Sequence, residues 1–342
     1  MNGLDKTYER YSRQMLFSGI GEEGQNKLSE TSILIVGMGA LGTAIANHLV
    51  RAGIGHVRMV DRDYVEMSNL QRQMLFDEHD VEMHVPKAEA AKQKLHSINS
   101  SIQLESIVAD VNPTNVMEFM DGIDIVLDGT DNFKTRFLLN DACFKMGIPF
   151  AYGGVVGANG LTSLFIPGET ACLSCLIQSD TSSGDTCDTI GVISPIVDIV
   201  ASMQCVEVLK WVTGEHDKLR RALVSIDVWN NRQHQISIAK PKTNCPTCQQ
   251  KSFVHLERSS DEATTMCGRE TVQINRGTPF DLKEWSKRLE PIAKDVKKTP
   301  FLIRVSLHEG ERFVMFPDGR VLVQGTEEIS RAKSLFSRYI GN

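Results

Sequence analysis

The stretch Ile33-Leu34-Ile35-Val36-Gly37-Met38-Gly39-Ala40-Leu41-Gly42 places a glycine turn of spacing G-x-G-x-x-G directly after an apolar, β-branched run. A helical pattern follows from Thr43. In such a unit the first glycine permits a tight turn, the second lets the backbone approach a phosphate, and the third lets the helix pack close to the strand. The stretch therefore predicts a nucleotide-binding strand–turn–helix unit, and a glycine turn without a ligand is the alternative.

A second strand is expected at residues 56–60, and it ends on Asp61. An acid at this distance from the glycine turn usually accepts a hydrogen bond from a ribose hydroxyl. Strand and helix patterns then alternate, with further strand candidates at residues 102–109, 123–127, 150–156 and 161–166. This order predicts an α/β fold with a doubly wound, mostly parallel, Rossmann-like sheet.

The bulk composition narrows the class of protein. The chain has 342 residues, 41% of them hydrophobic and 23% charged, as is ordinary for a globular protein. Its formal net charge is -6 and it has no long basic run, so we expect no nucleic acid as main partner. Residues 1–13 are too polar for a signal peptide, and the apolar segment 196–212 contains Asp198, Gln204, Glu207 and Lys210. We therefore expect a cytoplasmic protein without a membrane span.

The chain divides by composition into three parts. Residues 1–250 hold the alternating pattern, residues 251–266 form a polar linker, and residues 267–342 suggest a small α+β module. The module carries no recognisable chemistry, so its role is left open.

Two cysteine pairs, Cys172-x-x-Cys175 and Cys245-x-x-Cys248, lie on turn-like segments. Two such pairs can complete a tetrahedral thiolate site for Zn²⁺ that joins remote loops. Four thiolates leave no open coordination position, so the metal would be structural. Two unrelated reduced pairs, or a redox dithiol, are the alternatives.

A set of polar side chains suits a nucleoside triphosphate. Asn69 and Arg72 lie in a polar loop after the second strand, Lys87 follows a helix-opening proline, and Asp131 follows another strand. Cations would neutralise phosphates and the acid would serve Mg²⁺. Each residue alone is ordinary for a solvated surface or a turn. A nicotinamide-dependent oxidoreductase is the alternative function, but it leaves Arg72, Lys87 and Asp131 without a task.

Cys187 lies in a loop rich in Ser, Thr, Asp and Gly, residues 178–190. A thiol on an exposed loop can act as a nucleophile. The neighbouring Asp185 and Asp188 disfavour the thiolate, so strong activation of this thiol is not expected.

Several of these motifs together resemble the ThiF/MoeB/HesA family, the bacterial relatives of ubiquitin-activating enzymes. The resemblance spans about residues 5–250 and leaves the C-terminal module outside. Its most specific part is the string from Ser68 to Gln73. The motifs are Arg10-Tyr11-Ser12-Arg13-Gln14, the glycine turn, Asp61 through Gln73, Pro86-Lys87, Asp131-Asn132 and the two cysteine pairs.

The resemblance implies an ATP- and Mg²⁺-dependent adenylyltransferase. Its substrate would be the C-terminal glycine carboxylate of a small ubiquitin-like sulfur carrier, ThiS or MoaD, for thiamine or molybdenum-cofactor biosynthesis. The active unit would be a homodimer in which Arg13 reaches the phosphates of the neighbouring protomer. The implied nucleotide-binding residues are Gly37, Gly39, Ala40, Gly42, Asp61, Asp63, Ser68, Asn69, Leu70, Gln71, Arg72, Lys87, Asp131 and Asn132.

The expected catalytic residues are Arg13, Arg72, Lys87 and Asp131, with Cys187 as a candidate thiol. Two further alternatives stay open within this resemblance. A relative could activate a different acceptor, such as a small molecule or an RNA base, or could be an inactive scaffold. The sequence does not separate the ThiS and MoaD pathways, because the motifs concern only ATP and the carrier tail.

Overall fold

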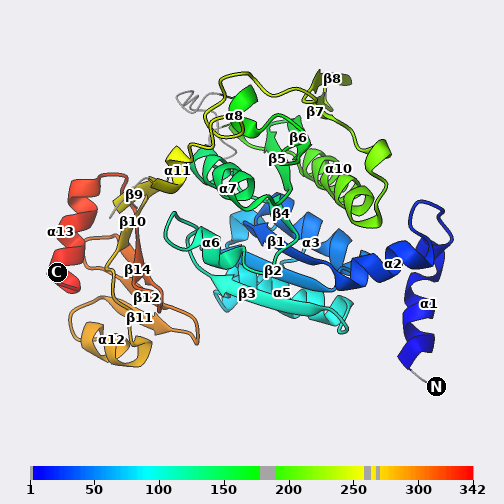
Figure 1. Ribbon diagram of the computed structural model, residues 1–342. Coiled ribbons are helices and arrows are strands. Elements are labelled where there is room, and N and C mark those ends of the chain that lie inside the picture. The colour runs from blue at the N-terminus through cyan, green and yellow to red at the C-terminus, as the bar shows by residue number, and fades with distance from the viewer. Residues whose placement is uncertain (1–2, 178–189, 258–262, 267–269, 342) are drawn as a thin grey trace. The chain divides into compact units, whose positions relative to one another are not determined.

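A computed structural model describes residues 3–177, 190–257, 263–266 and 270–341. The chain divides into two compact units, Met1–Arg258 and Ser259–Asn342 (Figure 1). The first unit contains the large sheet and most of the helices, and the second contains a smaller sheet with two helices of its own.

The first unit is built on an eight-stranded sheet in the order β3-β2-β1-β4-β5-β6-β7-β8. The five strands from β3 to β5 in that order run parallel, and β6, β7 and β8 add on antiparallel. The expected doubly wound α/β fold is confirmed. The strands are β1 (Ser32–Val36), β2 (His56–Asp61), β3 (Gln103–Val108), β4 (Ile125–Asp128), β5 (Phe150–Val156), β6 (Asn159–Phe165), β7 (Ala222–Asp227) and β8 (Arg232–Ser237).

Three helices of this unit each end at a glycine. Helix α3 (Ala40–Ala52) ends at Gly53, helix α7 (Phe133–Met146) ends at Gly147, and helix α10 (Ser194–Thr213) ends at Gly214. Each of these glycines has a positive φ, which a side chain would disfavour. The other helices are α1 (Gly3–Met15), α2 (Gly21–Glu30), α4 (Glu78–Glu82), α5 (Lys87–Ile98), α6 (Val116–Phe119), α8 (Leu173–Leu176) and α11 (Val254–Glu257), with 3₁₀ turns η1 (Met67–Asn69) and η2 (His216–Lys218).

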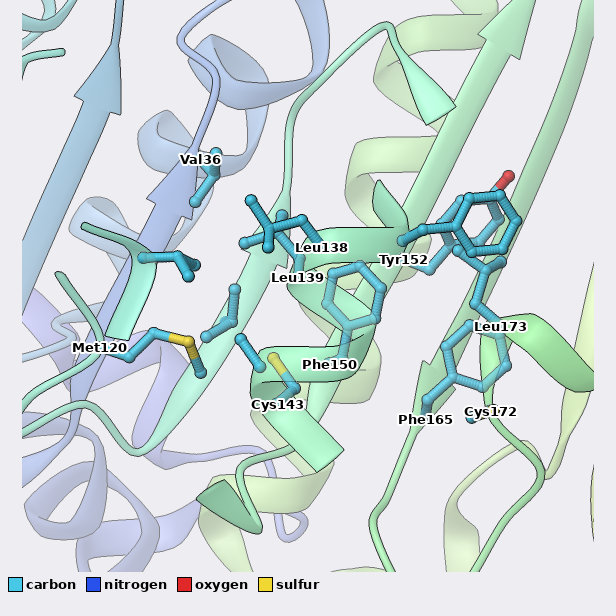
Figure 2. Close-up of a cluster of buried hydrophobic side chains, with 14 of the residues drawn as sticks. Val36, Met120, Leu138, Leu139, Cys143, Phe150, Tyr152, Phe165, Cys172 and Leu173 are labelled. Carbon is cyan, nitrogen blue, oxygen red and sulfur yellow. The ribbon is translucent and has the colours of Figure 1, made fainter. Parts of the chain in front are cut away.

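A buried hydrophobic cluster joins the middle of the sheet to α7. Figure 2 shows Leu138, Leu139 and Cys143 of α7 in one cluster with Phe150 and Phe165 of β5 and β6. Three of the four paired cysteines belong to the same cluster. The segments that carry the cysteines are therefore continuous with the core of the first unit.

The second unit is an antiparallel sheet in the order β11-β12-β13-β14-β10-β9. Two elements, α11 and β9, fall within the segment 251–266 that the sequence suggests as a linker. Because β9 pairs with β10, residues 263–266 belong to the sheet and not to a linker. The elements are β9 (Ala263–Met266), β10 (Thr271–Asn275), α12 (Leu282–Leu289), β11 (Asp295–Lys298), β12 (Ile303–Ser306), β13 (Arg312–Met315), β14 (Arg320–Gln324) and α13 (Ile329–Tyr339).

In the part of the chain that the structure describes, no helix is both long and apolar enough to cross a membrane.

Candidate nucleotide site and cysteine cluster

The candidate nucleotide site lies where the strand order reverses, between β1 and β4. In a doubly wound sheet this reversal opens a crevice beyond the carboxyl ends of the strands. The two connections that leave these strands approach closely here: a Cβ built on Gly37 would lie 2.7 Å from the carbonyl oxygen of Gly129. The backbone packing at the reversal point thus requires glycine on both sides.

The three glycines of the turn have different surroundings. Gly37 has φ +89°, and a Cβ on Gly42 would lie 1.8 Å from the Gly37 carbonyl oxygen, so both positions are closed to larger residues. A Cβ on Gly39 would have its nearest neighbours at 3.9 Å, the Gln73 amide nitrogen and the Gly129 oxygen. Gly39 is therefore less crowded than the other two glycines, which is the property needed where a phosphate approaches the backbone.

Asp61, at the carboxyl end of β2, is bound to the glycine turn. One carboxylate oxygen accepts a hydrogen bond of 2.6 Å from the Met38 N–H, and the other accepts one of 2.7 Å from the Asp63 N–H. Burial raises the pKa of the Asp61 carboxyl, while the nearby Lys87 ammonium and the two backbone donors oppose the shift. The acid thus fixes the turn and lies where a ribose hydroxyl is expected.

Lys87 begins α5 and is almost fully buried, with 3% of its surface exposed. Its ammonium lies 3.5 Å from a carboxylate oxygen of Asp63, and its backbone N–H donates to the Asp63 carbonyl. A buried cation beside Asp61 and Asp63 would offer positive charge to an anion in the site.

The loop after β2 supplies the other predicted phosphate ligands. Asn69 is buried in η1, where its side-chain oxygen accepts from the Glu66 N–H at 3.1 Å. Arg72 is half-buried and donates to the Ser68 carbonyl at 2.9 Å. Leu70 is half-buried, and Ser68 and the Gln71 side chain are exposed.

Gln73 is a residue of this loop that sequence reasoning did not assign to the site. Its side chain is buried, its amide nitrogen points toward Gly39, and its Oε1 has no hydrogen-bond partner among the described residues. A buried, unsatisfied oxygen next to the glycine turn suits a ligand or a water molecule. The sequence signal that points to Gln73 is its position at the end of the string Ser68 to Gln73.

A buried ion pair at the carboxyl end of β4 was also not predicted from the sequence. The Arg136 guanidinium of α7 donates to the Asp128 carboxylate at 3.1 Å, to the Thr130 carbonyl at 2.7 Å and to the Gly153 carbonyl at 3.1 Å. Burial raises the pKa of the Asp128 carboxyl, and Arg136 counteracts this. The pair fixes the backbone immediately before Asp131.

Asp131 and Asn132 follow directly. Asp131 is exposed at the carboxyl edge of the sheet, and Asn132 is the N-cap of α7, where its side-chain oxygen accepts from the Thr135 N–H at 2.8 Å. The structure therefore gives Asn132 a helix-capping role and places Asp131 directly before that cap.

Arg13 lies apart from the other predicted catalytic residues of its own chain. It is exposed in the last turn of α1, and the next residue, Gln14, donates to the Ala52 carbonyl at the far end of α3. A helix of 13 residues spans about 20 Å. The glycine turn leads into the opposite end of α3, so Arg13 lies about one helix length from the glycine turn of its own chain. Cys187 lies outside the described residues.

The four paired cysteines come together as predicted. The Sγ–Sγ distances are 3.9 Å for Cys172–Cys175, 3.5 Å for Cys172–Cys245 and 3.4 Å for Cys175–Cys248, and all four sulfurs lie within 4.8 Å of one another. Sulfurs bound to one tetrahedral Zn²⁺ at 2.3 Å are about 3.8 Å apart. Burial raises the pKa of the Cys248 thiol to about 12, whereas in Cys175 hydrogen bonds outweigh burial and lower the pKa. The donor set therefore fits zinc.

The sequence profile of the ThiF family matches residues 11–247. The chain belongs to the ThiF family. The resemblance drawn from the sequence motifs is thus confirmed.

Two relatives in this family are informative. The chain is 45% identical over 336 residues to the sulfur carrier protein ThiS adenylyltransferase of Bacillus subtilis, which covers 97% of this chain and 99% of that protein. It is 36% identical over 211 residues to the protein of the same name from Escherichia coli, covering 61% of this chain and 83% of that protein. The Bacillus match is long enough to include the C-terminal unit.

Among solved structures, the chain is similar to E. coli MccB crystallised with ATP. The TM-score is 0.62 at 24% identity, and the match covers 70% of this chain and 74% of that chain. At this identity the likeness shows a shared fold and no more.

Proposed function

We propose that this protein is an adenylyltransferase that uses ATP to activate the C-terminal carboxylate of a ThiS-type sulfur carrier. The names of its Bacillus and E. coli relatives support the activity and the carrier. The structural observation that carries the proposal is the glycine turn after β1, with room for a group at Gly39, held by the buried acid Asp61 at the end of β2 and near the buried cation Lys87. This family membership favours nucleotidyl transfer over the oxidoreductase alternative.

The reaction joins a carboxylate oxygen of the carrier to the α-phosphorus of ATP, and pyrophosphate leaves with the electrons of the broken P–O bond. The attacking carboxylate is already ionised at neutral pH, so no side chain has to remove a proton. Catalysis is therefore mostly positioning and charge neutralisation.

Each charged residue has a place in this scheme. Arg72 and Lys87 would neutralise the phosphates, with Asn69 as a neutral donor, and Asp61 would hold the ribose. An adenylyltransferase of this kind uses ATP with Mg²⁺, and Asp131 would hold that ion at the edge of the crevice. When bound, Mg²⁺ supplies positive charge at the leaving pyrophosphate.

A homodimer is part of the proposal. Arg13 lies a helix length away from the glycine turn of its own chain, so it would act on the neighbouring protomer. Ile199 and Val206, two helical turns apart on α10, are 38% and 48% exposed, and Leu16 and Phe17 after α1 are 76% and 65% exposed. Contiguous exposed apolar surface marks a protein interface, and we place the dimer interface on α10 and on the segment after α1.

Zinc would have a structural role. Cys172, Cys175, Cys245 and Cys248 supply four ligands, which leaves no position for substrate. The metal would hold the segment between β6 and α10 against the segment that follows β8.

The test is ATP–pyrophosphate exchange by the full-length protein, with purified ThiS and, in a separate assay, with purified MoaD. We expect exchange with ThiS that requires the carrier's C-terminal glycines. Exchange with MoaD alone would assign the other pathway, and exchange with neither would contradict the proposed acceptor.

A further inference from the structure

Helix α7 holds both cysteine segments through two adjacent, fully buried side chains, Asn140 and Asp141. The Asn140 side-chain oxygen accepts from the Leu173 N–H at 2.9 Å, and Leu173 directly follows the first cysteine of the first pair. The Asp141 carboxylate accepts from the Thr247 hydroxyl at 2.8 Å, and Thr247 lies between the cysteines of the second pair. One helix thus fastens two segments that lie 73 residues apart in the chain.

The second oxygen of Asp141 holds the segment that follows the second pair. It accepts from the His255 N–H at 3.0 Å. The His255 ring stacks on Phe137 of α7, with ring centroids 5.1 Å apart and an interplanar angle of 14°. Both carboxylate oxygens therefore accept hydrogen bonds, one from within the second cysteine pair and one from the segment after it.

Burial raises the pKa of the Asp141 carboxyl, while the backbone and hydroxyl donors oppose the shift. A buried carboxylate is costly unless donors surround it, and loss of the acceptor leaves those donors unsatisfied. Since Thr247 and His255 have this acceptor inside the core, the geometry of the second cysteine turn depends on Asp141.

The same helix begins at the nucleotide site. Its N-cap is Asn132, directly after Asp131, and its Arg136 binds the Thr130 carbonyl. Asp141 lies nine residues after the N-cap, about 14 Å along the helix axis. A rigid helix of this length connects the cysteine cluster to the loop that carries the expected magnesium ligand.

We propose that Asp141 is a positioning residue that sets the geometry of the cysteine cluster, and that α7 couples the metal centre to the nucleotide site. The first part rests on the hydrogen bonds and on the four sulfurs alone. The second part rests on the proposed function, because it assigns ATP to the crevice at Asp131.

The experiment uses the full-length, zinc-loaded protein and three variants. Asp141→Leu removes both acceptors, and Thr247→Val removes one donor with little change of shape. Asp141→Asn is the conservative variant, since its amide can accept from the His255 N–H and donate to the Thr247 oxygen. Asp80→Asn is the matched control, because Asp80 is also buried and accepts a backbone N–H from Asp77, but it lies in α4.

Zinc release to a chromogenic chelator and the Kd for ATP with Mg²⁺, measured without carrier, are the two readouts. Loss of a hydrogen-bond partner of a metal ligand commonly weakens metal binding by about 10- to 100-fold; since Asp141 holds the cysteine turn and not a sulfur, we expect release from Asp141→Leu to be accelerated by about tenfold, the lower end of that range. Thr247→Val should release zinc more slowly than Asp141→Leu, and Asp141→Asn should approach wild type. The coupling predicts that Asp141→Leu raises the Kd for ATP by about fivefold or more while Asp80→Asn leaves both readouts unchanged.

Wild-type zinc release from both Asp141→Leu and Thr247→Val would overturn the positioning role. If Asp141→Leu fails to fold, Thr247→Val decides. Fast zinc release with an unchanged Kd for ATP would overturn the coupling alone. Because neither readout contains a carrier, a wrong acceptor would appear only as failed exchange and would leave these results intact.

Discussion

Gly39→Ala tests whether the glycine turn receives a phosphate. The new Cβ would have its nearest neighbours at 3.9 Å, an ordinary contact distance, and the backbone at φ -80° and ψ -147° lies next to the extended region, so the free protein has steric room for it. The methyl group would instead occupy the space in front of the turn. Overpacking against a fitted group costs about 1–3 kcal/mol, which corresponds to a rise of about 5- to 150-fold in the Kd for ATP.

Gly42→Ala is the matched comparison. Here the Cβ would lie 1.8 Å from the Gly37 carbonyl oxygen, so the backbone of the turn or of α3 must move. The same 1–3 kcal/mol then appears as lost stability, and each kcal/mol lowers Tm by about 2–4 °C in a domain of this size. Gly42→Ala should therefore unfold earlier, whereas Gly39→Ala should keep the wild-type Tm.

Differential scanning calorimetry gives Tm, and isothermal titration calorimetry with ATP and Mg²⁺ gives Kd. We expect unchanged stability with weakened ATP binding for Gly39→Ala, and reduced stability for Gly42→Ala. Wild-type ATP affinity in Gly39→Ala would refute the assignment of the phosphate to this turn.

Three further outcomes are expected. Arg72→Ala and Asp131→Ala should each abolish pyrophosphate exchange with unchanged circular dichroism, and near-wild-type exchange in either would break the residue assignment. Stripping the metal with a chelator should lower Tm, because three buried thiols and one half-buried thiol then lose the ion that joins their segments, and an unchanged Tm would argue against a structural metal. The Tyr339 hydroxyl and Arg338 hold the pKa of Glu309 below its ordinary 4.5, so its contribution to stability is present above pH 4.5 and is lost as the pH falls further. Glu309→Gln should flatten this part of a Tm–pH curve, and a curve as steep as wild type would contradict the assignment.

Much of the first unit could be predicted from the sequence because its signals are local. The glycine turn, the acid at the end of β2 and the proline and glycine boundaries of α10 are each set by residues within one element. The two cysteine pairs could also be brought together from sequence, because tetrahedral metal chemistry requires four ligands and the chain has two matching pairs.

Long-range contacts account for what the sequence did not show. The Arg136 guanidinium donates to one carbonyl in the connection after β4 and to another in strand β5, and no local pattern distinguishes it from a solvated arginine on a helix. In the sequence, Asp141 looks like an ordinary acid on a helix. Its two hydrogen-bond donors, Thr247 and His255, lie more than a hundred residues away in the chain. Strand β9 was assigned to a linker because its pairing partner, and not its own composition, makes it a strand.

The most direct test of adenylyl transfer to ThiS is the intact mass of the carrier after incubation with this protein, ATP and Mg²⁺. We expect the carrier to gain the mass of one adenylyl group at its C-terminal glycine, together with release of pyrophosphate. A carrier that lacks the terminal glycines should gain no mass. An unmodified carrier with intact glycines, or ATP converted to ADP and phosphate, would contradict adenylyl transfer.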